Sequence, residues 1–144
     1  MNFKKASKFI LYSLILAFLG FIDSAYLTVL HYKNVIPPCS VLNGCEKVLT
    51  SQFSVIGPFP LAFFGVIFYL SVIGICLFIL LENKKEFVKI YHLAVNTGFL
   101  ISVALFLIQA FILKAYCQFC ILSEVISAGL MILSFLKYKE DKRI

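Results

Sequence analysis

Four long apolar segments dominate the chain and are separated by polar connections. They span residues 9–30, 61–81, 90–113 and 115–136. Each has about the 20 apolar residues that a helix needs to cross the hydrocarbon core of a bilayer. The connections between the last three segments are short, so these helices should pack as antiparallel neighbours. The pattern predicts an all-α membrane protein in which residues 1–144 form one domain, a bundle of four transmembrane helices.

The connection between the first two segments, His31 to Pro60, is much longer than the others, and we call it the outer loop. Turn-forming residues interrupt it at Pro37-Pro38, Asn43-Gly44, Gly57-Pro58 and Pro60. Between these breaks, Cys45 to Phe53 could form one short helix on the membrane surface. Unpaired backbone groups are unfavourable in lipid, so the loop should lie at the interface or cap the bundle. A lid over a cavity and a simple amphipathic connector both fit this sequence.

Composition agrees with a membrane protein. Hydrophobic residues make up 62% of the chain, the mean hydropathy is +1.00, and charged residues reach only 14%, against roughly 25% in soluble domains. This excludes an ordinary water-soluble globule. A chain of 144 residues also leaves no room for a soluble catalytic domain beside the bundle, so any large soluble partner is expected to be a separate chain.

The positive charges are distributed as membrane topology requires, which argues against nucleic-acid binding despite a net charge of +6. Most Lys and Arg residues lie before residue 9, between residues 82 and 89, and after residue 136, and few lie in the other two connections. By the positive-inside rule, both termini are cytoplasmic and the outer loop faces outward. The first apolar segment is too long for a signal peptide and lacks a small-residue cleavage pattern, so we expect it to remain as an anchor.

Four of the five cysteines fall in or beside the outward connections, where disulfides persist. Cys117 and Cys120 form a C-x-x-C at the start of the last helix, so both sulfurs share one helix face. The positive end of the helix dipole favours a thiolate there. Cys39 and Cys45 form a C-x5-C in the outer loop. A mobile pair and a fixed pair could exchange through a mixed disulfide.

Two less reactive interpretations of these cysteines are open. Small extracellular loops are often held by inert structural disulfides, which would make the protein a non-enzymatic membrane scaffold. Alternatively, C-x-x-C recurs in zinc sites, and the four sulfurs could form a four-thiolate centre.

Two carboxyl groups lie inside the apolar segments, where ionisable residues are rare and usually face a cavity or the bundle interior. Glu124 follows Cys120 by four residues and therefore shares its helix face. Asp23 lies at a similar depth on the first helix, so the two carboxyls could share a pocket and keep one proton between them. The alternative is that each only makes an interhelical hydrogen bond.

Further candidates come from the third and second helices. Gln109 lies at about the depth of Cys120, with Phe106 one turn below it. The second helix carries a row of residues at helical spacing, which is more typical of packing than of a cofactor site. We expect Cys76 in this row to be an unreactive, small hydrophobic residue. The members of this row are Gly65, Tyr69, Val72 and Cys76, and the aromatic residues beside them are Phe63, Phe64 and Phe68.

The order of these features resembles the vitamin K epoxide reductase family in its bacterial branch. The matching residues are Cys39-x5-Cys45, then Glu46-Lys47-Val48-Leu49-Thr50-Ser51, then Pro60-Leu61-x3-Gly65-x3-Tyr69, and finally Cys117-x2-Cys120. The resemblance covers nearly the whole chain. The quinone-linked DsbB family is the nearest competitor, but there the C-x-x-C precedes the more widely spaced pair.

The resemblance implies a four-helix bundle around a quinone, either ubiquinone or menaquinone, in a bacterial inner membrane. It makes Cys117 and Cys120 the active-site pair, Cys39 and Cys45 the shuttle pair, and Ser51 the functional hydroxyl near them. A reduced thioredoxin-fold partner of the DsbA type would attack Cys39, Cys45 would exchange with Cys117, and Cys120 would be left beside the quinone. We expect a thiol:quinone oxidoreductase without a metal site. The expected quinone-pocket residues are Phe64, Phe68, Phe106, Gln109, Glu124 and Asp23.

The chain departs from the animal members of this family at two positions. Those members have Thr-Tyr-Ala after the C-x-x-C, where this chain has Ser123-Glu124-Val125. Their quinone-contacting asparagine is replaced by Leu61. The polar groups of the pocket should therefore differ from those of the animal enzymes.

Overall fold

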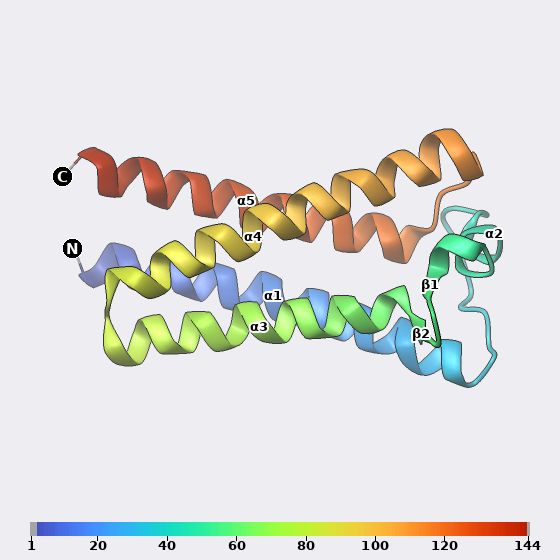
Figure 1. The fold of residues 1–144 in the computed structure, drawn as a ribbon, viewed down its shortest axis with the longest axis horizontal. Coiled ribbons are helices and arrows are strands. Elements are labelled where there is room, and N and C mark those ends of the chain that lie inside the picture. Colours follow the sequence, from blue (N-terminus) through green and yellow to red (C-terminus); the bar gives the residue numbers. More distant parts are fainter. Residues whose placement is uncertain (1–2, 144) are drawn as a thin grey trace.

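A computed structural model describes residues 3–143, and within them four helices are long and apolar enough to cross a membrane. They are α1 (Phe3–Tyr32), α3 (Leu61–Glu82), α4 (Lys85–Leu107), which continues into the π-helix η2 (Ile108–Leu113), and α5 (Gln118–Arg143). The helices run side by side, with both chain ends at one end of the bundle and the outer loop at the other (Figure 1). The predicted all-α, four-helix architecture is confirmed.

The helices extend beyond the predicted apolar segments, most clearly at three ends. α1 begins at Phe3 and α4 at Lys85, six and five residues before the expected starts, and α5 continues to Arg143. Hydropathy locates only the part of a helix that suits lipid, whereas backbone hydrogen bonding continues through polar ends. In the other direction, α5 begins at Gln118 rather than at residue 115, because Lys114 adopts a left-handed conformation with a φ of 48°.

The outer loop holds more structure than its sequence indicated. A short helix, α2 (Cys45–Leu49), is followed by one 3-10 turn, η1 (Gln52–Ser54). The expected single helix over Cys45 to Phe53 is therefore interrupted. The hydroxyl groups of Thr50 and Ser51 donate to the carbonyls of Glu46 and Val48 at 2.6 and 2.7 Å, and such local side-chain bonds compete with helix continuation.

A small hairpin then leads into α3. β1 (Val55–Ile56) pairs antiparallel with β2 (Phe59–Pro60), and Gly57 takes the positive φ of 61° that a tight two-residue turn requires. The hairpin was not predicted from the sequence. It directs the chain back across the end of the bundle before α3 begins (Figure 1).

Close helix packing creates the core of the bundle. A Cβ added at Gly20 would collide with the ring of Tyr69, so α1 and α3 approach closely at this level. Farther toward the chain ends, the hydroxyls of Ser13 and Tyr91 share a hydrogen bond of 2.8 Å. Tyr69, Val72 and Cys76 of the row on the second helix are buried, as the packing interpretation expected.

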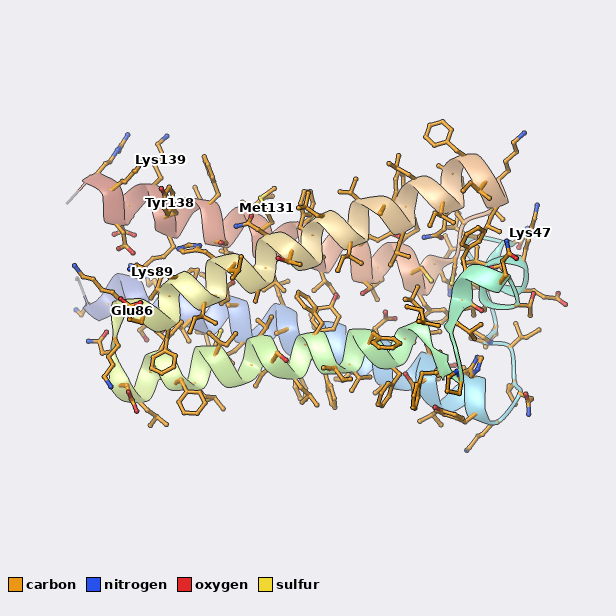
Figure 2. All side chains as sticks on the ribbon, viewed as in Figure 1. Lys47, Glu86, Lys89, Met131, Tyr138 and Lys139 are labelled. Carbon is orange, nitrogen blue, oxygen red and sulfur yellow. A yellow bond between two sulfur atoms is a disulfide. The ribbon has the colours of Figure 1, made fainter. Side chains whose placement is uncertain are left out.

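The outside of the bundle is apolar along its length and charged at its ends. Large hydrophobic side chains are exposed on all four long helices, which suits a surface in contact with lipid. Figure 2 shows the labelled charged residues Glu86, Lys89 and Lys139 at the end that holds the termini, and Lys47 at the loop end. This arrangement agrees with a multi-pass membrane protein.

Candidate functional site

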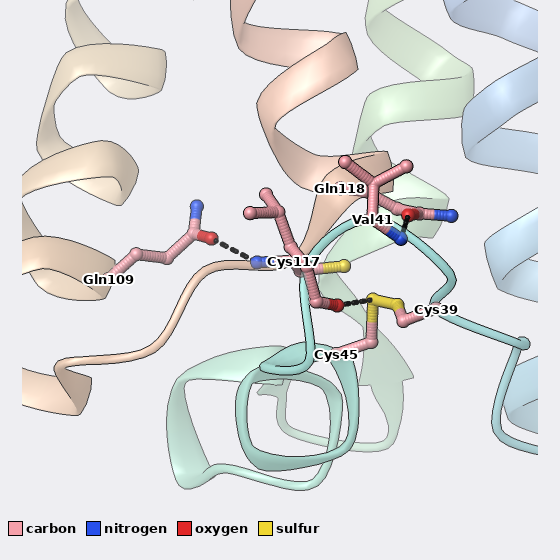
Figure 3. Close-up of a disulfide and its surroundings, with 7 residues drawn as sticks. Cys39, Val41, Cys45, Gln109, Cys117 and Gln118 are labelled. Atoms are coloured by element: carbon pink, nitrogen blue, oxygen red, sulfur yellow. Dashed lines mark hydrogen bonds between the residues drawn. A yellow bond between two sulfur atoms is a disulfide. The ribbon is translucent and has the colours of Figure 1, made fainter.

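The two cysteine pairs meet at the loop end of the bundle. Cys39 and Cys45 form a disulfide with a Cα–Cα distance of 6.1 Å, while Cys117 and Cys120 are free thiols. Cys45, Val48 and Cys117 are buried in one small apolar cluster, against which Cys39 and Cys120 also pack. Figure 3 shows the disulfide beside Cys117. The fold therefore brings the two cysteine pairs together, although more than 70 residues of sequence separate Cys45 from Cys117.

Two contacts hold the outer loop against the turn that precedes α5. The backbone N–H of Val41 donates to Oε1 of Gln118 at 3.1 Å (Figure 3). Gly44 lies so close to Tyr116 that an added Cβ would come within 2.5 Å of its carbonyl oxygen and 2.6 Å of its nitrogen. Only glycine fits this approach of two backbone segments. No feature of the sequence indicated either contact.

Cys117 occupies the residue before α5 and acts as its N-cap. Its carbonyl accepts the backbone N–H of Ile121 at 2.9 Å, which is the first bond of the helix. The Cys120 thiol donates a hydrogen bond to the Cys117 sulfur. This bond, with the backbone N–H groups of Cys120 and Phe119, lowers the pKa of Cys117 from 9.0 to about 7, although burial acts in the opposite direction. The thiolate form of Cys117 is therefore more accessible near neutral pH than that of an ordinary cysteine.

A cavity of about 800 Å³ opens beside Cys120 and is lined by residues of the four long helices and the outer loop. Residues from Val48 to Val55 line it, so the outer loop forms a lid rather than a simple connector. Phe64 and Phe68 contribute apolar walls. The size and the mainly apolar lining with a few polar groups are typical of small-molecule sites.

Gln109 connects the cysteine pair to the cavity. Its Nε2 donates to Oε1 of Glu124 at 2.7 Å, and its Oε1 accepts the backbone N–H of Cys117 at 3.1 Å. Gln109 is buried within η2, and its own carbonyl accepts the N–H of Ala115 at 3.2 Å. Helical turns of this wide type often occur at functional sites. The sequence placed Gln109 at the right depth but gave no sign of the π-helix.

The polar end of the cavity contains both carboxyl groups. Asp23 and Glu124 line it together with Ser127, and Oδ2 of Asp23, Oε2 of Glu124 and Oγ of Ser127 are buried without a hydrogen-bond partner among the described residues. Tyr69, which also lines the cavity, is engaged, since its hydroxyl donates to the carbonyl of Ser123 at 3.0 Å and lies 2.8 Å from that residue's hydroxyl. Buried polar atoms usually have partners, so the three unpaired atoms mark a place for ligand oxygens.

Most of the residues expected in the quinone pocket line this cavity, as does Ser51 of the outer loop. Those expected pocket residues are Asp23, Phe64, Phe68, Gln109 and Glu124. Phe106 does not line it. It is 42% exposed, and its ring lies 6.2 Å from that of Tyr116 on the outer side.

The outward direction of the Phe106 side chain has a simple geometric cause. The inward face of α4 and η2 runs through Gly98, Ser102, Leu105 and Gln109. Phe106 follows Leu105 and so points about 100° away from it. Depth along the helix predicted its level correctly, but depth does not determine the direction of a side chain.

The positions of the possible metal ligands bear on the alternative of a zinc site. In the described part of the chain, no three His, Cys, Asp or Glu side chains are grouped so that they could hold a metal ion. Two of the four cysteines at the loop end are joined in the disulfide. Metal analysis of the purified protein is the test of the zinc alternative.

Comparison with known proteins gives one finding. The family model described as the Vitamin K epoxide reductase family matches residues 11–135. This range contains both cysteine pairs, the outer loop and every residue named at the cavity. A comparison with curated proteins gives no match.

Proposed function

The chain belongs to the vitamin K epoxide reductase family, and from this premise we propose that it is a thiol:quinone oxidoreductase that reoxidises a disulfide-forming partner. Membership supports a quinone-linked membrane oxidoreductase in general. The observation that carries the specific proposal is the series formed by the four cysteines. Cys39 is partly exposed, Cys45 and Cys117 are buried together, and Cys120 lines the cavity. Electrons would pass along this series from outside to inside.

The first exchange would take place at Cys39. Cys45 is only 1% exposed, whereas Cys39 is partly accessible, so an incoming thiolate can reach only the latter. The thiolate of a reduced thioredoxin-fold partner forms a bond to the Cys39 sulfur, and Cys45 leaves as a thiolate. The second thiol of the partner then attacks its own bonded sulfur and releases Cys39. The partner leaves oxidised, and the loop pair is reduced by two electrons.

The second exchange would join the two pairs. With Cys117 and Cys120 bonded to each other, the Cys45 thiolate attacks the Cys117 sulfur and Cys120 leaves into the cavity. Cys39 then attacks Cys45, re-forming the loop disulfide and releasing Cys117. A thiol of low pKa leaves faster, so the N-cap position of Cys117 favours this last step. A bonded loop pair and a reduced C-x-x-C are the products of this exchange.

The cavity fits a quinone, which would supply an acceptor for two electrons and two protons. Phe64 and Phe68 would hold its ring, and Asp23 and Glu124 would face its oxygens. The chain's own part is to present the Cys120 sulfur at this cavity and to exclude water beneath the lid of the outer loop. Ser51, on the lid near the loop cysteines, would orient the same oxygens. The quinone would be ubiquinone or menaquinone.

The direction of insertion belongs to the same proposal. We infer a bacterial inner membrane protein with both termini in the cytoplasm and the cysteine pairs outside, where a thioredoxin-fold partner would act in trans. The orientation can be tested in a variant whose own cysteines are all replaced, by placing a single cysteine at Lys47 or at Lys139. Intact cells are then treated with a membrane-impermeant maleimide, which labels only cysteines outside the membrane. Labelling of Lys47→Cys but not of Lys139→Cys is expected, and the opposite pattern would reverse the orientation.

The decisive test uses detergent-purified protein, a soluble quinone analogue and a reduced DsbA-type protein. The wild-type chain should oxidise the partner only when quinone is present, and Cys120→Ala should abolish this activity. Cys76→Ala is the matched control, because Cys76 is buried in the bundle core and should leave turnover unchanged. Absence of any quinone-dependent oxidation would favour the scaffold with inert disulfides, and stoichiometric zinc in the purified protein would favour the metal alternative.

A further inference from the structure

The polar end of the cavity is not needed for thiol exchange, yet it concentrates the unpaired polar atoms of the site. Asp23 is 6% exposed and Ser127 is 4% exposed, and both have an oxygen without a partner in the described part of the chain. Oε2 of Glu124 is likewise buried without a hydrogen-bond partner among the described residues. Two carboxyl groups directed into one largely apolar cavity are unfavourable unless they have a use there.

The side chain of Glu124 is held in one orientation. Gln109 donates to one of its oxygens at 2.7 Å and leaves the other oxygen free toward the cavity. Gln109 is itself held by the Cys117 backbone N–H at 3.1 Å. The position of Glu124 is therefore tied to the residue that begins the C-x-x-C. Glu124 also follows Cys120 by one helical turn, so both point into the cavity from the same face of α5.

No cation balances the two carboxyls. Among the described residues that line the cavity there is no Lys or Arg, and the other titratable side chains are His31 and Tyr69 with the thiol of Cys120. The lining residues of α4 are uncharged. Burial away from water and from any balancing cation disfavours ionisation of both carboxyls, so at least one keeps its proton. A neutral carboxylic acid beside a reacting centre can donate that proton.

We propose that Glu124 is the proton donor to the ligand oxygen nearest Cys120, that Asp23 is the second carboxyl of the same donor site, and that Gln109 is the positioning residue for Glu124. This rests on the proposed function and adds a proton route to it. Oxidation of the C-x-x-C dithiol forms one S–S bond and releases two electrons and two protons. The ligand takes up the same number of each. Glu124 gives one proton to the ligand oxygen and regains one from the thiol pair as its disulfide forms. Asp23 gives the second proton to the ligand's other oxygen and regains the second proton that the thiol pair releases.

One test needs neither quinone nor turnover. Infrared difference spectra between the oxidised and the dithiol form of the protein should contain a C=O band of a protonated carboxyl, because closing the disulfide changes its surroundings. Glu124→Gln or Asp23→Asn should remove or shift this band. Glu86→Gln is the matched control, since Glu86 is exposed and paired with Lys89 at 3.3 Å. A spectrum with no such band, or a band that both cavity variants leave unchanged, would overturn the proposal.

The closing experiment measures turnover with the quinone analogue as a function of pH. Glu124→Gln should lower kcat about 100-fold and change KM little, because general acid catalysis of this kind contributes roughly 10²- to 10⁴-fold. Glu124→Asp should recover part of the loss and shift the pH profile. Gln109→Ala should lower kcat less and shift the same profile, which a purely structural role would not do.

Failure of this proposal is distinguishable from failure of the function. Exchange between the two cysteine pairs can be followed separately by thiol alkylation and gel shift, and it should proceed normally in Glu124→Gln. Normal exchange with wild-type turnover and an unchanged pH profile in that variant would eliminate the proton route and leave the oxidoreductase standing. A wild-type protein that never reduces quinone would instead reject the function on which the proposal rests.

Discussion

The backbone N–H of Val41 donates a hydrogen bond of 3.1 Å to the side chain of Gln118, the first residue of α5. Val41 lies between the two cysteines of the loop, and Gln118 lies between the two cysteines of the C-x-x-C. This bond therefore joins the middle of one pair to the middle of the other. It explains how a proline-rich loop can keep its disulfide beside Cys117 without a long helix of its own.

Removing that bond should slow transfer between the pairs. We expect Gln118→Ala to reduce the rate of exchange by up to about tenfold, because a hydrogen bond of this type contributes roughly 0.5–1.5 kcal/mol. The rate can be measured by quenched alkylation after one equivalent of reduced partner is added. Lys47→Ala, in the exposed part of α2, is the control and should exchange normally. Equal rates in the two variants would show that the loop is held by other contacts.

Gly44 provides a sterically sharper test of the same contact. In Gly44→Ala the new Cβ would lie within 2.5 Å of backbone atoms of Tyr116, which cannot rotate away as a side chain could. Overpacking of this kind typically destabilises by about 1–3 kcal/mol, and the loop disulfide should move away from Cys117. We expect slower exchange between the two pairs, with an unchanged rate of attack by the reduced partner on the loop disulfide at Cys39.

Gly74→Ala is the matched control for this substitution. Apart from its chain neighbours and the adjacent helix backbone, no atom of the described residues lies within 4 Å of a Cβ added there, and the residue is inside α3. Alanine favours a helix over glycine by roughly 0.8–1.0 kcal/mol, so this variant should be at least as stable as the wild type. Normal exchange in Gly44→Ala would contradict the close approach.

The reactivity of Cys117 should depend on pH in a predictable direction. Its pKa is lowered to about 7, so the thiolate dominates above about pH 7 and the unreactive thiol dominates below it. In a variant with Cys39, Cys45 and Cys76 replaced, the rate of reaction with a small thiosulfonate should rise with a midpoint near 7. Adding Cys120→Ala removes the largest cause of the shift, and the midpoint should move upward toward 9.0. The same midpoint in both proteins would show that the Cys120 thiol does not lower the pKa of Cys117.

Aromatic residues of the cavity and of the outer surface should differ in their effect on ligand binding. Phe68→Ala removes a cavity wall whose ring also packs on Gly98, and binding of a quinone analogue should weaken about tenfold or more, given roughly 1.5–3 kcal/mol for a buried phenylalanine. Phe106→Ala should have little effect because its ring faces outward. The two affinities can be compared by equilibrium binding in detergent. A larger loss of affinity in Phe106→Ala than in Phe68→Ala would show that Phe106 contacts the ligand.

Much of the site could be anticipated from the order of residues because its chemistry is local in the chain. The C-x-x-C at a helix start, the cysteines flanking Asn43-Gly44, and the helical spacing of Cys120 and Glu124 are short-range patterns. The contacts that join them are long-range. Nothing near Gln109 in the sequence indicates that its amide would face Cys117 on one side and Glu124 on the other.

The sequence by itself determined the number of membrane helices, the level of each polar residue along them, and the grouping of the cysteines at one end. These depend on helix periodicity and on the energetic separation of apolar and charged residues, which are properties of single segments. Only the tertiary structure decided which side chains face inward, as the contrast between Gln109 and Phe106 illustrates. That choice depends on how neighbouring helices rotate to pack against one another, and here also on the π-helix and on the lid that the outer loop forms.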